Sequence, residues 1–444
     1  MITKLTLKNV GPAPSMEVEF SPRLNIITGD NGLGKTFILD AAWFALTRTW
    51  AGESMFMPLG RGTRQAPPQI NYTVIGKTGN PVDAESRFDF DAQEWTGKQA
   101  RPPMPGLVIY ARIDGGFSVW DPARNYWRDR NPNAEDAEAG VPGPGRERPR
   151  SYQFSKDQVW DGLSEKIGDV ERDVCNGLIR DVEAWRLRQN GAFKLLQDIL
   201  TTLSPDDVEF LKLGEGMRVS IDDVRDVPTF VLPYGTVPVT KAAAGMKRVL
   251  ALAYLIVWAW EEHQVASRAL QSDPTDRMVV LFDEVEAHLH PKWQRRFVPA
   301  LVKVIESALL KDQGASTQFI CTTHAPLVLG SIESIWDREM DRLLDLDLDD
   351  DRQVVIDDDV PFEKHGNADS WLESTLFDLP SAYSREAEKE MALADVFMRE
   401  HPDARTAPRD EMQAINENLS KVLGGDDEYF GFWRPYYRTA GGAQ

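Results

Sequence analysis

Cysteine is scarce in this sequence, which has only Cys175 and Cys321 in 444 residues. Two thiols so far apart argue against a disulfide framework or a zinc ribbon, and they are typical of a reducing compartment. Long apolar runs are missing as well, since the longest, from Val249 to Trp260, falls short of the roughly 18 residues of a membrane span. The N-terminus lacks the basic head and apolar stretch of a signal peptide. We therefore expect a cytoplasmic protein with no membrane partner.

Positive charge is also in short supply, because 50 Lys and Arg residues face 70 Asp and Glu residues and the formal net charge is -20. So acidic a protein has no overall attraction to nucleic acids, and binding would need a local basic patch or a basic partner. The densest basic cluster, Arg146, Arg148 and Arg150, lies in a segment at 131–150 that is rich in Pro, Gly and charge. A flexible, solvated loop is a simpler interpretation of this segment than a nucleic-acid site.

A glycine-rich segment carries the most specific motif of the sequence. Residues 29–36 fit the pattern G-x-x-x-x-G-K-[ST], between a predicted strand at 24–27 and a predicted helix at 37–47. In such a loop successive N–H groups and the helix N-terminus point at phosphates, while Lys35 reaches the outer phosphates and Thr36 offers Mg²⁺ a hard oxygen. The residues predicted to bind ATP are Gly29, Asp30, Asn31, Gly32, Gly34, Lys35 and Thr36.

Two further predicted strands end in chemically useful side chains. The apolar run 278–282 ends in Asp283 and Glu284, and a buried parallel strand would present both acids at its carboxyl edge. Asp283 would then hold Mg²⁺ and Glu284 would act as general base towards water; an acidic N-cap of the next helix is the plainer alternative. The strand at 319–322 leads to His324, which could contact the outer phosphate or serve only as a surface or core histidine.

The rest of the chain suggests a core interrupted by an insertion. We expect an α/β core in two parts, at 1–50 and 240–360, a large inserted α+β lobe at 51–239, and a helical C-terminal region at 361–444. Alternating apolar residues predict a hairpin at 2–20. Helical spacing predicts helices at 157–203, 245–263 and 291–310, and short apolar runs predict strands at 219–221 and 229–232.

In order and spacing, these motifs resemble the ATPase heads of the ABC superfamily, in the branch that includes RecF, Rad50, SMC and OLD-type proteins. The stretch Glu284–Pro291 is similar to the residues after the acidic pair in the RecF/OLD branch. The amino-acid sequence of the insertion, including 159–163 and 175–179, resembles that of the ATPases of Septu-type and retron-linked phage defence, which work with a separate HNH nuclease. The resemblance implies an ABC-type head with a mixed or parallel central sheet, ATP and Mg²⁺ as ligands, and a homodimer or higher even-numbered oligomer.

The resemblance also implies that each phosphate loop meets a signature motif of the other subunit. By alignment that motif includes Ala243, Ala244 and Gly245, at the start of the long apolar helix. The family has Ser where Ala243 stands, so a hydrogen bond to the outer phosphate is missing, and turnover is expected to be slow or partner-dependent. For the glutamine that senses Mg²⁺ in this family, Gln158 and Gln153 are both candidates.

Other interpretations remain for some residues. His288, His290 and His324 could form a metal cluster, although the family resemblance accounts for all three without one. The aspartates within 341–359 could bind a cation, but an exposed acidic hairpin is simpler. Trp258 and Trp260 lie in the apolar helix and are expected in the core.

The sequence therefore predicts an ATP hydrolase that dimerises around ATP and Mg²⁺ and regulates a partner effector, such as a nuclease, in phage defence. Nucleic acid would then be contacted through the complex. A RecF- or SMC-like DNA-repair ATPase is the alternative, which the net charge and the absence of sustained heptads argue against. A transporter subunit is a more distant one.

Overall fold

The computed structural model describes the chain in two compact units, Met1–Ala368 and Asp369–Gln444. The described residues are 1–52, 62–97, 104–125, 151–167, 170–205, 211–306, 316–357, 360–377 and 379–441. The whole of the predicted loop at 131–150, with its arginine cluster, lies outside them.

The first unit is built on a sheet that is eight-stranded within the described residues, and its inner strands are parallel. In spatial order the strands are β18 (Val354–Asp357), β17 (Asp341–Leu348), β3 (Leu24–Gly29), β16 (Ser316–Thr322), β15 (Arg277–Phe282), β7 (Leu107–Ala111), β8 (Phe117–Trp120) and β9 (Tyr152–Phe154). Strands β3, β15 and β7 are almost wholly buried, as expected for parallel strands covered on both faces. The predicted α/β class with a mixed central sheet is confirmed.

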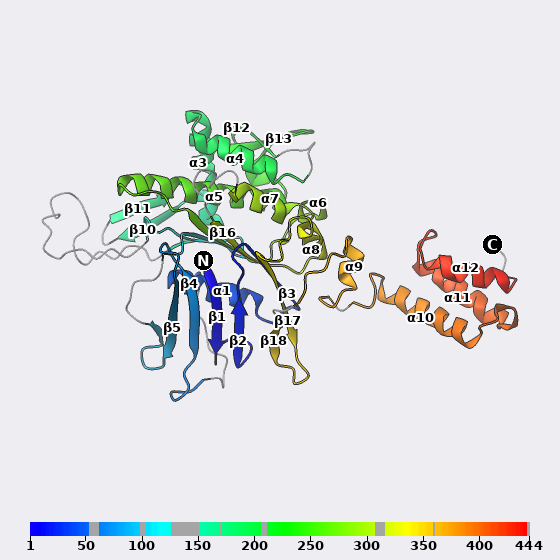
Figure 1. Cartoon of the computed structure of the whole chain (residues 1–444). Coiled ribbons are helices and arrows are strands. Elements are labelled where there is room, and N and C mark those ends of the chain that lie inside the picture. The colour runs from blue at the N-terminus through cyan, green and yellow to red at the C-terminus, as the bar shows by residue number, and fades with distance from the viewer. Residues whose placement is uncertain are drawn as a thin grey trace, which may run out of the picture. The chain divides into compact units, whose positions relative to one another are not determined.

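A second, antiparallel sheet lies below the first in Figure 1. Its strands, in order, are β2 (Ser15–Glu19), β1 (Ile2–Lys8), β4 (Gln69–Ile75), β5 (Pro81–Asp89) and β6 (Glu94–Gly97). The helix after the glycine-rich loop, α1 (Lys35–Thr47), shares one apolar core with both sheets. Because α1 is buried on two sides, it is apolar around most of its circumference and holds the glycine-rich loop on a rigid support.

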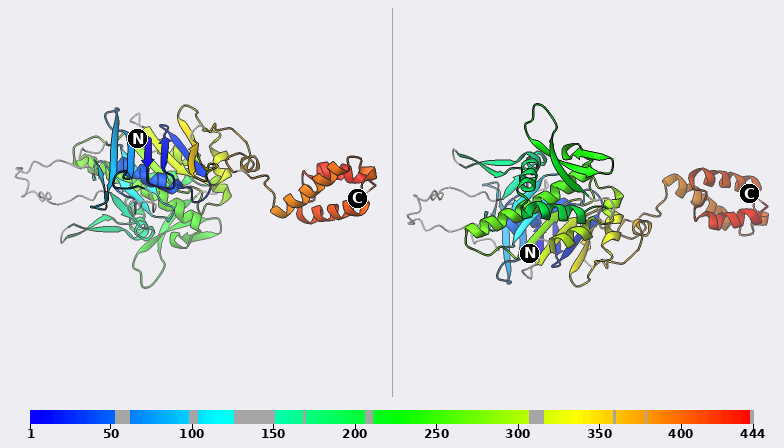
Figure 2. Two further views of the ribbon diagram at one scale, coloured as in Figure 1. Left: turned by 90° about the horizontal axis from the view of Figure 1, so that it is seen from below. Right: turned by 90° about the horizontal axis from the view of Figure 1, so that it is seen from above.

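The long helix α5 (Ala244–Ala269) covers the other face of the central sheet together with α7 (Phe297–Val304), as seen from above in Figure 2. Every residue from Val249 to Trp260 is buried, so both predicted core tryptophans are confirmed. Phe282 of the sheet stacks on Phe297 at a ring distance of 5.8 Å. None of the described helices is both long enough and apolar enough to cross a membrane.

The predicted insertion at 51–239 is divided between the sheets and a lobe, since β4 to β9 complete the two sheets. The lobe comprises α2 (Lys156–Asp161), β10 (Leu163–Ile167), β11 (Val170–Cys175), α3 (Leu178–Arg188), α4 (Gly191–Thr202), β12 (Lys212–Arg218), β13 (Asp226–Leu232) and β14 (Gly235–Pro238). Its elements α3, α4, β12 and β13 lie beyond α5 in Figure 1. The domain limits themselves stay a prediction.

Three predicted elements were wrong in detail. The helical stretch 157–203 is interrupted by the β10–β11 hairpin, which Gly162 and Gly177 bracket in backbone conformations with positive φ. The strand predicted at 219–221 lies outside β12 and β13. The helix predicted at 291–310 is split into α6 (Pro291–Gln294) and α7, because Pro299 fits the first turn of a helix but not a continuous one.

Helices dominate the second unit, as predicted for the C-terminal region. They are α10 (Arg385–Glu400), α11 (Arg409–Val422) and α12 (Phe430–Thr439), and α9 (Ala368–Leu372) begins at the unit boundary. Trp433 is fully buried in their common core with Phe397 and Leu419.

Replacing Gly106 with Ala is expected to lower the free energy of unfolding of the first unit by about 2–4 kcal/mol. Gly106 precedes β7 with φ of 106°, and an added Cβ would collide with the backbone carbonyl of Arg277 on the neighbouring strand. Urea denaturation measures the effect. Gly191→Ala is the matched control, because nothing lies within 4 Å of an added Cβ there. Equal losses in both variants would contradict the close approach.

Candidate nucleotide-binding site

Three adjacent parallel strands bring the sequence motifs together. Strand β16 pairs with β3 on one side and with β15 on the other, all in the same direction. The carboxyl ends of parallel strands meet at one edge of a sheet, which is where α/β proteins bind their ligands. The glycine-rich loop follows β3, Asp283 and Glu284 follow β15, and His324 follows β16, so segments nearly 300 residues apart form one site.

The glycine-rich loop has the backbone that phosphate binding requires. Gly29, Gly32 and Gly34 have φ values of 119°, 84° and 106°, a region open to glycine at little cost. Gly34 is the N-cap of α1, and at Gly29 a side chain would collide with the carbonyl of Leu346 on β17. The loop is therefore held open at the N-terminus of α1, where N–H groups are free to point at an anion.

Lys35 is folded into this loop. Its Nζ donates to the carbonyl oxygens of Gly29 and Asp30, both at 2.8 Å, and the residue is buried. Burial lowers the pKa of Lys35, and the nearby charge of Glu284 partly opposes that shift. The two carbonyls hold the ammonium over the loop, where an oxyanion could replace them.

Thr36 and Asp283 meet although they are 247 residues apart. The Thr36 hydroxyl lies 2.9 Å and 3.1 Å from the two carboxylate oxygens of Asp283, and the Thr322 hydroxyl donates to the same carboxylate at 2.8 Å. Asp283 is almost fully buried. Hard oxygens of this kind are the ligands that Mg²⁺ prefers, so the residues present fit the ion.

Glu284 and His324 face each other beside this pair. Their closest side-chain atoms, Oε1 and Nε2, are 3.8 Å apart, and both side chains are about one-third exposed. Glu284 has a φ of 45°, an uncommon conformation for a residue with a side chain, and its N–H donates to the Thr322 hydroxyl at 2.7 Å. A carboxylate held this way at a water-accessible edge can take a proton from water.

Three residues that support the acids were missed at the sequence level. Thr322 joins Asp283 to Glu284, and the Glu286 carboxylate accepts from the N–H of His324 and the hydroxyl of Thr323. Arg248 donates to the backbone carbonyls of Asp283 and Glu284 at 3.2 Å and 3.3 Å. The only sequence signal for these three residues was their position next to the motifs. Their contacts join elements that are distant in sequence, so the contacts themselves could not be predicted.

The predicted signature residues lie at the start of α5. Ala243 is the N-cap and supplies no side-chain cap, and both Ala243 and Ala244 are exposed. Gly245 is buried where a side chain would press on the carbonyl of His288. Exposed N–H groups at a helix N-terminus are available to a partner's anion, as the prediction requires.

Both candidate glutamines already have structural partners. The Gln158 side chain accepts from the N–H of Ser155 and completes the capping box of α2. Gln153 accepts from Arg112 at 3.2 Å and donates to the carbonyl of Trp50 at 3.1 Å. A role of Gln158 as a Mg²⁺ ligand therefore stays a prediction without support from its contacts.

The histidines and the aspartate run, which were the alternative candidates for a metal site, have other structural roles. Among the described residues no group of three or more His, Cys, Asp or Glu side chains could hold a metal ion. His290 accepts from Lys292 N at 3.2 Å and caps α6. The acidic run forms β17 and β18, an antiparallel hairpin as predicted, but Asp341 is buried and paired with Arg23.

Asp40 on α1, close to the site, makes the free energy of unfolding depend on pH. Burial, with a smaller contribution from Asp283, raises the pKa of Asp40 to about 6, although the Tyr110 hydroxyl donates to it at 3.1 Å. The folded chain thus holds this proton longer than the unfolded chain, so stability falls as pH rises from about 4 to 6. Asp40→Asn should raise the free energy of unfolding by about 1–2 kcal/mol at pH 8 and hardly at pH 4. Thermal melts at pH 4 and pH 8 measure the change in stability, with Asp198→Asn, on the exposed surface of α4, as the control. An equal gain in stability at the two pH values would contradict the raised pKa of Asp40.

Comparison with known proteins agrees with this geometry. Residues 4–85 match the family described as "AAA domain", and residues 233–330 match the one described as "AAA domain, putative AbiEii toxin, Type IV TA system". The two matches cover the glycine-rich loop, the acidic pair and His324. Both matched segments contribute strands to the central sheet, β3 from the first and β15 and β16 from the second.

Curated relatives extend the match to most of the chain. The "Retron Ec83 probable ATPase" of Escherichia coli is 22% identical over 408 residues, which cover 76% of this chain and 71% of the relative. The "Septu protein PtuA" of Bacillus thuringiensis is 20% identical over 367 residues, covering 80% and 78%. The SMC head domain of Thermotoga maritima superposes with a TM-score of 0.38 and 16% identity over 81% of this chain and 99% of that one. The chain therefore carries an AAA-type ATP-binding domain and is a homologue of the retron ATPases and of the Septu PtuA proteins.

Proposed function

We propose that this chain is an ABC-type ATPase that dimerises around ATP and Mg²⁺ and thereby controls a separate effector, a nuclease, in defence against phage. The observation that carries the proposal is the meeting of Lys35, Thr36, Asp283, Glu284 and His324 at one edge of the central sheet. The names of the retron and Septu relatives support the defence context.

Each side chain has a distinct task in the proposed reaction. Lys35 exchanges its two carbonyl partners for phosphate oxygens, and the loop N–H groups hold the remaining phosphates. Thr36 and Asp283 would hold Mg²⁺, which supplies positive charge to the phosphates when bound. Glu284 orients a water and accepts its proton. His324, 3.8 Å from Glu284, donates to the outer phosphate.

Dimerisation would complete the site. The exposed N-terminus of α5 offers N–H groups to the outer phosphate held by the other subunit. Ala243 cannot add the hydroxyl that Ser provides in the ABC family, and a hydrogen bond to a charged group is worth roughly 1.5–3 kcal/mol. We therefore expect a weak dimer and slow turnover unless a partner supports them.

The dimer is tested by sedimentation of the purified chain with and without Mg-ATP. Glu284→Gln is expected to trap ATP and shift the chain to a dimer, whereas the wild type would dimerise only transiently. Ala243→Ser should strengthen the dimer at least about tenfold, in line with one recovered hydrogen bond at each of its two sites. A chain that stays monomeric in both variants at saturating Mg-ATP would overturn the dimer.

The effector is tested with the neighbouring reading frames of the operon. Cells that express the whole operon should resist phage in a plaque assay, and Lys35→Ala should abolish the protection. Protection by this chain alone would remove the effector from the proposal. Tight DNA binding by the isolated chain at physiological salt would instead favour a RecF- or SMC-like repair ATPase.

A further inference from the structure

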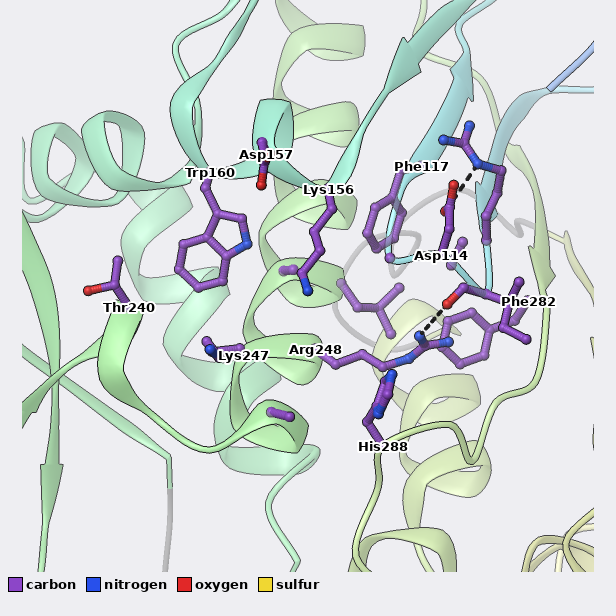
Figure 3. Close-up of a pocket in the computed structure, with 17 residues that line it drawn as sticks. Asp114, Phe117, Lys156, Asp157, Trp160, Thr240, Lys247, Arg248, Phe282 and His288 are labelled. Atoms are coloured by element: carbon purple, nitrogen blue, oxygen red, sulfur yellow. Dashed lines mark hydrogen bonds and ion pairs between the residues drawn. The ribbon is translucent and has the colours of Figure 1, made fainter. Parts of the chain in front are cut away.

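A cavity of about 280 Å³ lies beside the acidic pair, between the end of β7, the short helix α2 and the first turns of α5. Figure 3 shows Lys156 and Trp160 from α2, Lys247 and Arg248 from α5, and His288 arranged around it. The lining does not include Lys35 or Thr36, so the cavity is separate from the glycine-rich loop. Its volume lies just below the roughly 300–1,000 Å³ of typical small-molecule pockets, so it suits a small ligand.

Positive charge gathers on this cavity in a protein whose net charge is -20. Within the described residues, the side-chain ammonium groups of Lys156 and Lys247 make no hydrogen bond or ion pair. Of the two acids on the wall, Asp114 is already paired with Arg112 at 3.4 Å. Two cations without partners and one remaining acid, Asp157, leave a surface that attracts an anion.

Arg248 adds a second, independent sign of a missing partner. Its Nε is buried and has no hydrogen-bond partner among the described residues, although its terminal nitrogens donate to carbonyls. A buried cationic donor without an acceptor is costly, and Arg248 lines the cavity in which an anion would bind.

Aromatic and apolar side chains complete the wall. Trp160 is half-buried on one side, Phe117 and Phe282 are buried on the other, and Leu252 is a further apolar lining residue. A flat ring can stack on an exposed tryptophan face, while phosphate alone would gain nothing from these surfaces.

We propose that this cavity binds a small anion that carries an aromatic ring, of the class of the nucleoside monophosphates, and that Arg248 links it to the acidic pair. The same guanidinium that lines the cavity holds the backbone carbonyls of Asp283 and Glu284. An anion that forms an ion pair with Arg248 would weaken its hold on these carbonyls and shift Glu284, which already has a strained backbone. This link, unlike the binding itself, rests on the proposed ATPase function.

Calorimetry on the Lys35→Ala chain, without Mg²⁺, tests the binding with adenosine 5′-monophosphate as the probe. We expect it to bind at least about tenfold more tightly than adenosine or inorganic phosphate, because only it has both the ring and the charge. Adding Lys156→Ala or Trp160→Ala should weaken binding about tenfold. Trp160→Phe should restore most of it, and Lys194→Ala, an exposed lysine on α4, should change nothing.

Several outcomes would overturn the proposal. Binding that needs Lys35 would place the probe in the glycine-rich loop, and binding unaffected by Lys156→Ala and Trp160→Ala would place it elsewhere. The absence of binding would remove the site. In the wild type, the probe should change ATP turnover, and Trp160→Ala should abolish that change; an unchanged turnover despite binding would remove the link through Arg248. A wild type that hydrolyses no ATP would overturn the proposed function while leaving the binding result intact.

Discussion

Replacement of Glu284 by Gln is expected to cut ATP turnover by about 10²–10⁴ and to leave ATP binding intact. The amide keeps the shape of the side chain and its place 3.8 Å from His324, but it cannot accept a proton from water. Asp283 and Thr36, which would hold Mg²⁺, keep their contacts. Steady-state phosphate release and equilibrium binding of labelled ATP measure the two quantities separately.

A matched control is Glu171→Gln, an exposed carboxylate on β11. Its turnover should equal that of the wild type. If Glu284→Gln also turned over at the wild-type rate, Glu284 would not be the base. If it lost ATP binding as well, its role would be structural, through the Thr322 contact at its backbone.

Replacement of Lys35 by Ala is expected to weaken ATP binding about 10²-fold or more. Lys35 is buried, and its Nζ donates to the two loop carbonyls at 2.8 Å. Without it, those carbonyls face the phosphates with no positive charge between them. Hydrogen bonds to charged groups contribute roughly 1.5–3 kcal/mol each, and two of them account for the expected loss.

Calorimetric titration with Mg-ATP measures this loss, and Lys8→Ala, an exposed lysine at the end of β1, is the control. A thermal melt of each variant without nucleotide shows whether the loop still folds. Unchanged affinity in Lys35→Ala would mean that ATP binds elsewhere, and the proposed site would fail.

Local patterns predicted the elements that carry the site. The strand, glycine-rich loop and helix from 24 to 47 are consecutive, so their periodicity and turn residues were sufficient, and β3 and α1 match them. The buried strand before Asp283 was predicted for the same reason. Gln158 stays an untested Mg²⁺ ligand, although Ser155 three residues earlier is a capping-box signal that favours a structural role.

Long-range pairing could not be predicted in this way. Strand β7 lies next to β15, and β17 lies next to β3, but nothing in their own residues specifies those neighbours. The prediction of a separate lobe from residue 51 overlooked that β4 to β9 belong to the two sheets. Pairing of strands depends on contacts between residues far apart in the chain, and single-sequence patterns describe only near neighbours.

The sequence by itself determined the chemistry available to this protein: a loop for phosphates, an acidic pair and a histidine, each at the end of a predicted strand. Only the tertiary structure decided that these ends meet, because the parallel order of β3, β16 and β15 sets one common edge. It also decided what surrounds them. Thr322, Glu286 and Arg248 reach the acids from other elements, and the cavity beside Arg248 exists only where α2, α5 and β7 come together.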